Sequence, residues 1–269
     1  MSTPPSPSDP PLRRVELSGG TVSYCDEGAG PCVVAVHGLP GSSRDFRWLA
    51  PVLARGVRVI RPDMPGFGGT ALAVEPDPSV DARARFVLEF LDALEVSRPV
   101  LLGHSMGGVV AARAVSMRSD RFTGLGLVSS PALRPHRLWL RLMRARRLLP
   151  YLANPTIAKL AGKALRPAFV KSGFRGSFSD MALSHTLRCL AAVDFASHAA
   201  AAKAPAPPCL VAFCDDDPMI EKELLIELAE ACAPGPRLRF ATGGHNPQKA
   251  WAEELGAAVV DWAAQLGRA

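Results

Sequence analysis

Residues 99–113 read PVLLGHSMGGVVAAR. The apolar run at the start predicts a strand and residues 105–118 predict a helix, so a Gly-x-Ser-x-Gly motif lies at a strand-to-helix turn. Such a turn leaves no room for side chains beside the serine, which accounts for Gly103 and Gly107. It would hold Ser105 in a strained conformation at the end of the sheet. We therefore predict that Ser105 is a nucleophile; the alternative is a glycine-rich turn with an incidental serine.

Short apolar, β-branched runs alternate with longer amphipathic stretches on both sides of this motif. The runs predict strands over residues 32–37, 57–61, 99–103, 123–129, 209–213 and 237–241. The stretches predict helices over residues 43–54, 79–94, 105–118, 219–232 and 247–266. Nearly continuous apolar character is typical of strands covered on both faces. The expected fold class is therefore α/β, with a mostly parallel central sheet flanked by helices and preceded by an antiparallel hairpin around Gly19-Gly20.

The alternation breaks between Pro131 and the run Pro205–Pro208, where the chain is helical in pattern and rich in Leu and Arg. We predict an α/β core over residues 13–130 and 205–269, with a helical cap inserted over residues 131–204. Residues 1–12 are expected to form a flexible N-terminal tail. Their composition fits neither a signal peptide nor a membrane span.

The formal net charge of +6 comes from the cap. Residues 131–204 hold 13 Lys/Arg against 2 Asp/Glu, a net of +11, which leaves 18 minus 23, or −5, for the rest. Four arginines recur there at helical spacing beside an apolar stripe: Arg134, Arg137, Arg141 and Arg144, with Leu138, Leu142, Ala145 and Leu149. Three interpretations remain open: a solvated face, a site for an acidic substrate group or a thioester's carrier, and contact with an anionic membrane surface.

Composition limits the remaining classes of function. With 48% hydrophobic and 21% charged residues, the chain has the balance of a globular protein, and it lacks the aromatic platforms of a nucleic-acid binder. The six cysteines form neither a Cys-x-x-Cys pair nor an interleaved Cys/His pattern, so we expect no metal site. Cys32 and Cys209 lie in apolar runs and are expected to be buried free thiols. A cytoplasmic location is predicted.

Two further loops complete a resemblance to the α/β-hydrolase superfamily over nearly all of residues 13–266. His37-Gly38-Leu39-Pro40-Gly41 is similar to the family's oxyanion-hole loop. The resemblance implies that the Leu39 backbone N–H is one oxyanion donor. The Met106 N–H, at the start of the helix after Ser105, is expected to be the second. The alternative interpretation of residues 37–41 is a plain turn. His104 belongs to the other segment, the turn around Ser105.

The loop Asp63-Met-Pro-Gly-Phe-Gly-Gly-Thr70 resembles the family's loop after the next strand. We expect Asp63 to be structural and to accept backbone hydrogen bonds beside the site.

A serine hydroxyl needs a base, and the base needs an orienting acid. The run 209–213 leads into Cys214-Asp215-Asp216-Asp217-Pro218, which is similar to the family's acid-bearing loop and implies that Asp217 is the acid. Cys214 stands where the family usually has glycine, so Asp215 and Asp216 remain alternatives. Some relatives carry the acid after the preceding core strand, but residues 129–131 read Ser-Ser-Pro and offer no carboxylate.

The base is expected to follow the last strand, where Thr242-Gly243-Gly244-His245 stands. Of the six histidines, His245 has both the expected loop and the expected order, 245 − 217 = 28 residues after the acid. The catalytic prediction is therefore Ser105, Asp217 and His245.

These residues predict a serine hydrolase that cleaves an ester or thioester bond of a small or acyl substrate through an acyl-enzyme, without a cofactor. A serine argues against the related haloalkane dehalogenases and epoxide hydrolases, which carry Asp at this turn. A carbon-carbon bond hydrolase and a cofactor-free haloperoxidase-like enzyme remain alternatives, although Asn246 stands where many of the former carry an aromatic residue. A binding protein of the same fold is a further alternative. The sequence gives no oligomeric state.

Overall fold

The computed structural model describes residues 8–131, 133–171, 174, 178–204 and 207–268. Residues 1–7, most of the predicted tail, lie outside the described residues. Near the end of that tail, the Asp9 carboxylate accepts a hydrogen bond from the buried Arg61 guanidinium at 3.0 Å. Asp9 also pairs with Arg44, so the chain is tied to the core from this residue onward.

The described residues form a sheet of eight strands in the order β1-β2-β4-β3-β5-β6-β7-β8. The strands are β1 Arg13–Leu17, β2 Gly20–Glu27, β3 Cys32–Val36, β4 Arg58–Pro62, β5 Val100–His104, β6 Gly124–Val128, β7 Cys209–Cys214 and β8 Arg237–Phe240. Strand β2 is antiparallel to both of its neighbours, β1 and β4, and strands β3 to β8 run parallel to one another. The predicted fold class and hairpin are confirmed.

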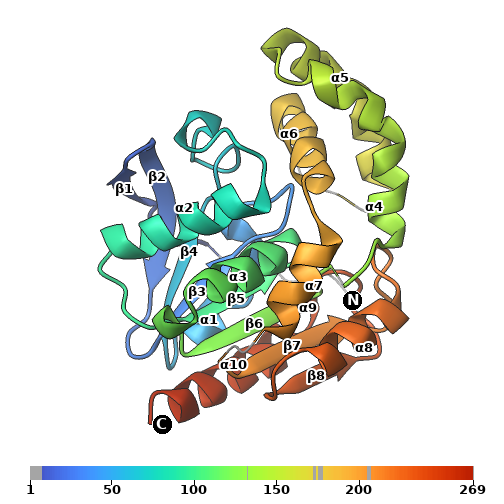
Figure 1. Cartoon of the computed structure of the whole chain (residues 1–269). Coiled ribbons are helices and arrows are strands. Elements are labelled where there is room, and N and C mark those ends of the chain that lie inside the picture. Colours follow the sequence, from blue (N-terminus) through green and yellow to red (C-terminus); the bar gives the residue numbers. More distant parts are fainter. Residues whose placement is uncertain (1–7, 132, 172–173, 175–177, 205–206, 269) are drawn as a thin grey trace.

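Two apolar layers sandwich this sheet because side chains alternate along each strand. In β3, Val34 and Val36 face one layer, whereas Val33 and Ala35 face the other. Helices α2 Val80–Ala93, α3 Met106–Met117, α7 Phe195–Lys203 and α8 Lys222–Ala231 belong to the first layer. Helices α1 Ala50–Leu53 and α10 Ala252–Leu266 cover the second (Figure 1).

The last strand corrects one expectation. β8 was expected to be covered on both faces, but its residues alternate between exposed and half-buried. It is one of the two edge strands of the sheet, and the exposed Arg239 pairs there with Asp215 at 2.7 Å. Charged side chains of this kind keep an edge strand from pairing with another chain.

Two predicted helices are broken. Residues 43–54 form a 3-10 turn, η1 Ser43–Phe46, and the short helix α1, because Pro51 has no N–H and favours a helix start. Residues 247–266 form α9 Pro247–Ala250 and α10, separated by Trp251. Trp251 leaves the helical conformation, and its ring stacks on that of Phe240 with 4.8 Å between the ring centroids. Its indole N–H donates a hydrogen bond to the Thr242 carbonyl.

The predicted cap is helical throughout its regular elements. They are α4 Arg137–Leu142, η4 Met143–Tyr151, α5 Pro155–Lys171, α6 Asp180–Ala191 and α7. Helices α5 and α6 pack closely, because a Cβ at Gly162 would collide with the Asp180 backbone. Helix α7 instead packs against α3 of the core (Figure 1). Among the described residues, no helix combines the length and apolar character needed to cross a membrane.

Candidate active site

Ser105 lies at the turn between β5 and α3, and its backbone is strained. Its φ of 51° and ψ of −125° are unusual for a residue with a side chain. A hydrogen bond from its N–H to the Val128 carbonyl, 2.9 Å long, helps to hold this conformation. The backbone therefore matches the strained turn expected from the sequence.

The glycines around Ser105 allow three backbone segments to meet. A Cβ at Gly103 would overlap the Gly107 carbonyl, and a Cβ at Gly107 would overlap the carbonyl of Val36 in β3. A Cβ at Gly108 would meet the Ser130 hydroxyl. These contacts set the start of α3 directly against β3 and β5, which leaves the serine at the carboxyl edge of the sheet.

His245 joins the serine to a carboxylate. Its Nε2 lies 2.8 Å from the Ser105 Oγ, and its Nδ1 lies 2.7 Å from the Asp217 Oδ2. His245 is buried, and the Asp217 side chain is fully shielded from solvent. In the neutral state this pattern requires a proton on Nδ1 and leaves Nε2 to accept the serine proton.

The three consecutive aspartates occupy different positions. Asp215 is turned toward the surface and forms two hydrogen bonds with Arg239. Asp216 accepts hydrogen bonds from the N–H groups of Gly243 and Gly244, the two residues before His245. Asp217 alone among the three contacts the imidazole.

The environment of Asp217 keeps its carboxylate ionised. Burial alone would raise the pKa of Asp217, but the His245 imidazole and the backbone N–H groups of Met219 and Ile220 more than offset this effect. Those two N–H groups lie 2.8 and 3.1 Å from Oδ1. The net result is a lowered pKa, so the negative charge beside His245 persists well below neutral pH.

His104 fixes the backbone of His245. Its Nε2 donates to the His245 carbonyl at 2.8 Å, and the two rings lie 5.1 Å apart. Burial, followed by repulsion from His245, lowers the pKa of His104 to about 3. His104 therefore stays neutral and adds no positive charge beside His245.

The loop after β3 lies directly against the serine. A Cβ at Gly38 would come within 3.0 Å of the Ser105 Cβ. The His37 ring fixes this loop, because Nδ1 donates to the Gly38 carbonyl at 2.7 Å and Nε2 accepts from the Met64 N–H at 2.9 Å. In the described part of the chain, neither the Leu39 N–H nor the Met106 N–H donates a hydrogen bond. Both predicted oxyanion donors are therefore available.

Asp63 braces the same loop from the next strand. Its two carboxylate oxygens accept hydrogen bonds of 2.7 Å from the N–H groups of Ser43 and Gly69. The side chain is buried, and its hydrogen bonds within the described residues go to these N–H groups and not to Ser105 or His245. This geometry agrees with the structural role expected from the sequence.

Replacing Asp63 should destabilise the fold. Asp63→Ala leaves the Ser43 and Gly69 N–H groups without their acceptors, which we expect to cost about 3 kcal/mol of unfolding free energy. Asp63→Asn retains one acceptor oxygen and should cost less. Urea unfolding of both variants measures the difference, and an Ala variant as stable as the wild type would contradict this role.

Five of the six histidines have lowered pKa values. Burial is the main cause at His37, His104, His136, His185 and His198, and it lowers the pKa of His136 to about 4 and that of His185 to about 3. These rings stay neutral in the folded protein, whereas the unfolded chain binds protons below about pH 6.5. Stability should therefore be greatest above that pH and be lost as the pH falls.

The expected loss between pH 7.5 and 5.5 is about 1.4 kcal/mol of unfolding free energy for each such histidine. Urea unfolding at the two pH values measures it. His136→Gln keeps an amide donor for the Met219 carbonyl. This variant should show a pH-dependent loss of unfolding free energy that is smaller than that of the wild type by the contribution of one histidine. Equal unfolding free energies for the wild type at both pH values would refute this expectation.

A polar junction between core and cap was not expected from the sequence. Arg83 of α2 is fully buried; it donates to the Pro65 carbonyl at 3.2 Å and contacts the imidazole of His185 in α6. Phe67 packs on the same ring at 5.5 Å. The only signal in the sequence is a cation within the apolar register of residues 79–94. The junction ties the loop of Asp63 to the cap.

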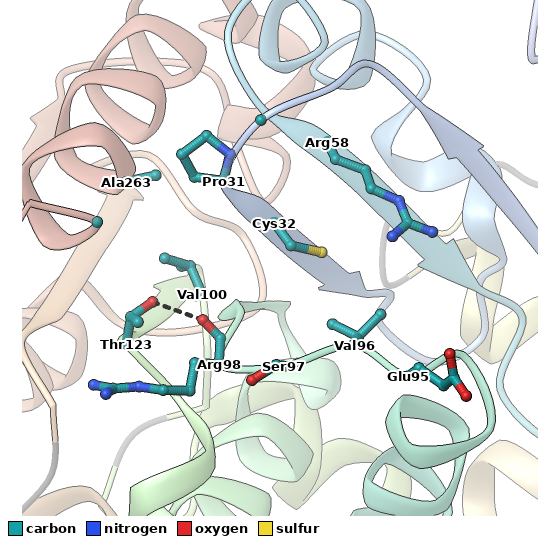
Figure 2. A pocket seen from close by; sticks show the side chains of 12 residues that line it. Pro31, Cys32, Arg58, Glu95, Val96, Ser97, Arg98, Val100, Thr123 and Ala263 are labelled. Atoms are coloured by element: carbon teal, nitrogen blue, oxygen red, sulfur yellow. Dashed lines mark hydrogen bonds between the residues drawn. The ribbon is translucent and has the colours of Figure 1, made fainter.

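A cavity of about 420 Å³ lies away from these residues (Figure 2). Pro31, Cys32, Val100 and Thr123 line it at the amino ends of the strands, whereas Ser105 follows the carboxyl end of β5. Cys209 is buried as expected, but Cys32 is only half-buried because this cavity opens beside it. Across the described residues, no three His, Cys, Asp or Glu side chains are grouped to hold a metal ion.

Comparison with known proteins places this geometry in a family. Residues 31–249 match the family model described as alpha/beta hydrolase fold. The 2-hydroxymuconate semialdehyde hydrolase of Pseudomonas sp. (strain CF600) is 28% identical over 96% of this chain and 95% of its own length. The crystal structure of the protein lip1 from Acinetobacter baumannii AYE superposes with a TM-score of 0.78 at 21% identity, covering 96% of this chain and 92% of that one.

Other relatives match over shorter stretches. An epoxide hydrolase of Caballeronia sordidicola is 32% identical over 44% of this chain and 36% of its own length. The chain covers 34 to 45% of the length of the first curated relatives. The family model spans most of the chain and agrees with the parallel sheet and the turn at Ser105. The chain therefore belongs to the alpha/beta hydrolase fold family.

Proposed function

We propose that the protein is a serine hydrolase that cleaves an ester or thioester bond of a small-molecule or acyl substrate. The continuous hydrogen-bonded series Ser105–His245–Asp217 carries this proposal. The Ser105 Oγ attacks the acyl carbon while His245 Nε2 accepts its proton. The same proton then passes to the departing alkoxide or thiolate, which leaves an acyl-enzyme.

The second half of the reaction uses the same groups. His245 takes a proton from water, whose oxygen attacks the acyl carbon, and the proton returns to Ser105 as the acid leaves. The N–H groups of Leu39 and Met106 are the proposed donors to the oxyanion in both halves. Their position beside Ser105 and their lack of other acceptors support this assignment.

Ser105 also bears on the alternatives. A serine at this turn argues against the epoxide hydrolase and haloalkane dehalogenase branches, whose members carry an aspartate there, because a serine hydroxyl forms an acyl-enzyme with a carbonyl substrate instead. A cytoplasmic location forms part of the proposal, supported by the six free thiols in the structure.

Carbon-carbon bond hydrolysis is the second candidate. The nearly full-length match to the 2-hydroxymuconate semialdehyde hydrolase supports it, because that relative covers core and cap alike. Asn246, which is exposed beside His245, stands where many such enzymes carry an aromatic residue. This difference favours the ester.

A substrate panel separates the two reactions. The panel contains p-nitrophenyl esters of increasing acyl length, an acyl-thioester and a dienoate ketone. We expect the highest kcat/KM with an ester or a thioester, and Ser105→Ala should lower it by several orders of magnitude. Turnover of the dienoate ketone alone would replace the proposed reaction with carbon-carbon bond hydrolysis. If no substrate were turned over and a fluorophosphonate probe did not label Ser105, both reactions would be rejected.

A further inference from the structure

The cap exposes large apolar side chains that the core does not. Of the eight such residues in the described part of the chain, seven lie between Leu140 and Met181, and the eighth is Leu12. Leu140, Tyr151 and Leu160 each expose more than half of their surface. Single exposed leucines are ordinary, but a concentration on one element marks an interaction site.

These apolar side chains alternate with cations along α4 and η4. Arg137, Leu140, Arg141 and Arg144 recur at helical spacing, and all are exposed. Apolar residues of the opposite side are buried, among them Leu138, Leu142 and Met143. The outward side of this segment is therefore apolar and basic at once.

Helix α5 continues the pattern at the periphery of the molecule (Figure 1). Its outward side carries Lys159, Leu160, Lys163, Val170 and Lys171, with Leu160 65% and Val170 61% exposed. The opposite side packs on α6 through buried residues: Ala158, Ala161, Leu165 and Phe169. We call the outward sides of α4, η4 and α5 the outer cap face.

The charge of the outer cap face has one sign. Residues 137–171 contain nine Lys/Arg and no Asp or Glu. Within the described residues, its cations Arg144, Arg147, Lys159 and Lys163 form no salt bridge. These charges are therefore available to an external anion.

We propose that the outer cap face binds the surface of an anionic phospholipid bilayer. The exposed leucines and valine would enter the boundary between headgroups and acyl chains, while the lysines and arginines contact the lipid phosphates. Helix α5 alone extends about 25 Å along such a surface, since each helical residue rises 1.5 Å. This inference rests on the outer cap face and not on the proposed reaction.

Two other occupants fit less well. A second copy joined through the same face would bring like-charged surfaces together across the two-fold axis, which is repulsive. An acidic protein would neutralise the cations, but it would also need apolar pockets shaped for each protruding side chain. A bilayer accepts both kinds of group without such matching.

Vesicle flotation tests the proposal with the full chain. The wild type should bind phosphatidylcholine vesicles containing phosphatidylglycerol, bind pure phosphatidylcholine weakly, and lose binding at high salt. Each surface cation contributes about fivefold to partitioning. Removing four cations should therefore weaken binding to anionic vesicles about 600-fold. The quadruple variant for this test carries Arg144→Gln, Arg147→Gln, Lys159→Gln and Lys163→Gln.

A second variant tests the apolar contribution. Leu160→Ser combined with Val170→Ser should weaken binding to anionic vesicles at least about tenfold, because both side chains lose their place in the hydrocarbon boundary. Its control is Leu12→Ser, which replaces a leucine outside the cap that is 57% exposed and should bind like the wild type.

The control for charge is a quadruple variant that also removes four positive charges, but from the core. It replaces four exposed arginines with glutamine: Arg14, Arg85, Arg98 and Arg268. This control should retain most binding, and thermal melting confirms that each variant folds. A wild type that does not bind anionic vesicles at low salt overturns the proposal. Equal loss of binding in the cap and core quadruple variants also overturns it. A wild type that does not bind vesicles but forms a dimer, which the cap quadruple variant disrupts and the core variant does not, would assign the face to a second copy instead.

Discussion

Ser105→Ala should lower kcat by about 10⁴- to 10⁶-fold and abolish labelling by a fluorophosphonate probe. The expected size follows from the geometry, because the Ser105 Oγ is the group that His245 Nε2 contacts at 2.8 Å. Without the oxygen, no acyl-enzyme forms, and only residual turnover from bound water and the oxyanion donors remains. Steady-state kinetics with a p-nitrophenyl ester and mass spectrometry of the labelled protein measure both effects.

A matched serine provides the control. Ser129 follows β6 as Ser105 follows β5; it is buried, has a φ of 41°, and its hydroxyl has no partner among the described residues. Ser129→Ala should keep nearly full activity and labelling. If it lost activity as Ser105→Ala does, or if Ser105→Ala were still labelled, the nucleophile would be assigned wrongly.

The strained backbone at Ser105 should also affect the free energy of unfolding of the Ser105 variants. Glycine adopts a positive φ without steric cost, so Ser105→Gly should be inactive yet more stable than the wild type by about 1 kcal/mol. Ser105→Ala keeps the strained backbone and should not show this gain. Urea unfolding of the two inactive variants separates backbone strain from the loss of the hydroxyl.

Local motifs made the turn, the central strands and the loop of His245 predictable. The strand that precedes Ser105, the glycines beside it and the glycines before His245 act within a few residues, so the sequence contains the whole signal. The hairpin around Gly19-Gly20 was predictable for the same reason.

Contacts distant in sequence were not predictable. The break at Trp251 depends on the ring of Phe240, and the half-exposed character of β8 depends on its place at the edge of the sheet. The Arg83–His185 contact joins two elements that are 102 residues apart. No periodicity within one helix reports such a pairing, because each partner satisfies the local pattern without it.

The choice among the three aspartates shows the same limit within the site. From the sequence, Asp215, Asp216 and Asp217 differ only by register, and one residue of slip would exchange their roles. In the structure each carboxylate has its own partners: Arg239, the backbone of Gly243 and Gly244, and His245. Asp216 thus positions the histidine loop, a role for which the sequence contains no local signal.

Asp217→Asn should therefore lower kcat by about 10⁴-fold, the largest loss among the three substitutions. The asparagine amide would donate to His245 Nδ1 and so favour the tautomer with its proton on Nε2, which cannot accept the Ser105 proton. Asp216→Asn keeps one of two acceptors for the Gly243 and Gly244 N–H groups, and a displaced His245 should cost roughly 10- to 100-fold. Asp215→Asn breaks an exposed ion pair and should leave kcat near that of the wild type.

The substrate-concentration dependence separates these roles further. Asp217→Asn acts on proton transfer, so kcat and kcat/KM should fall together while KM stays close to its wild-type value. Melting temperatures of the three variants serve as the folding control. A larger loss of kcat at Asp215 or Asp216 than at Asp217 would move the acid to that residue, and it would require the histidine loop to reorganise in solution, because in this structure only the Asp217 carboxylate reaches the imidazole.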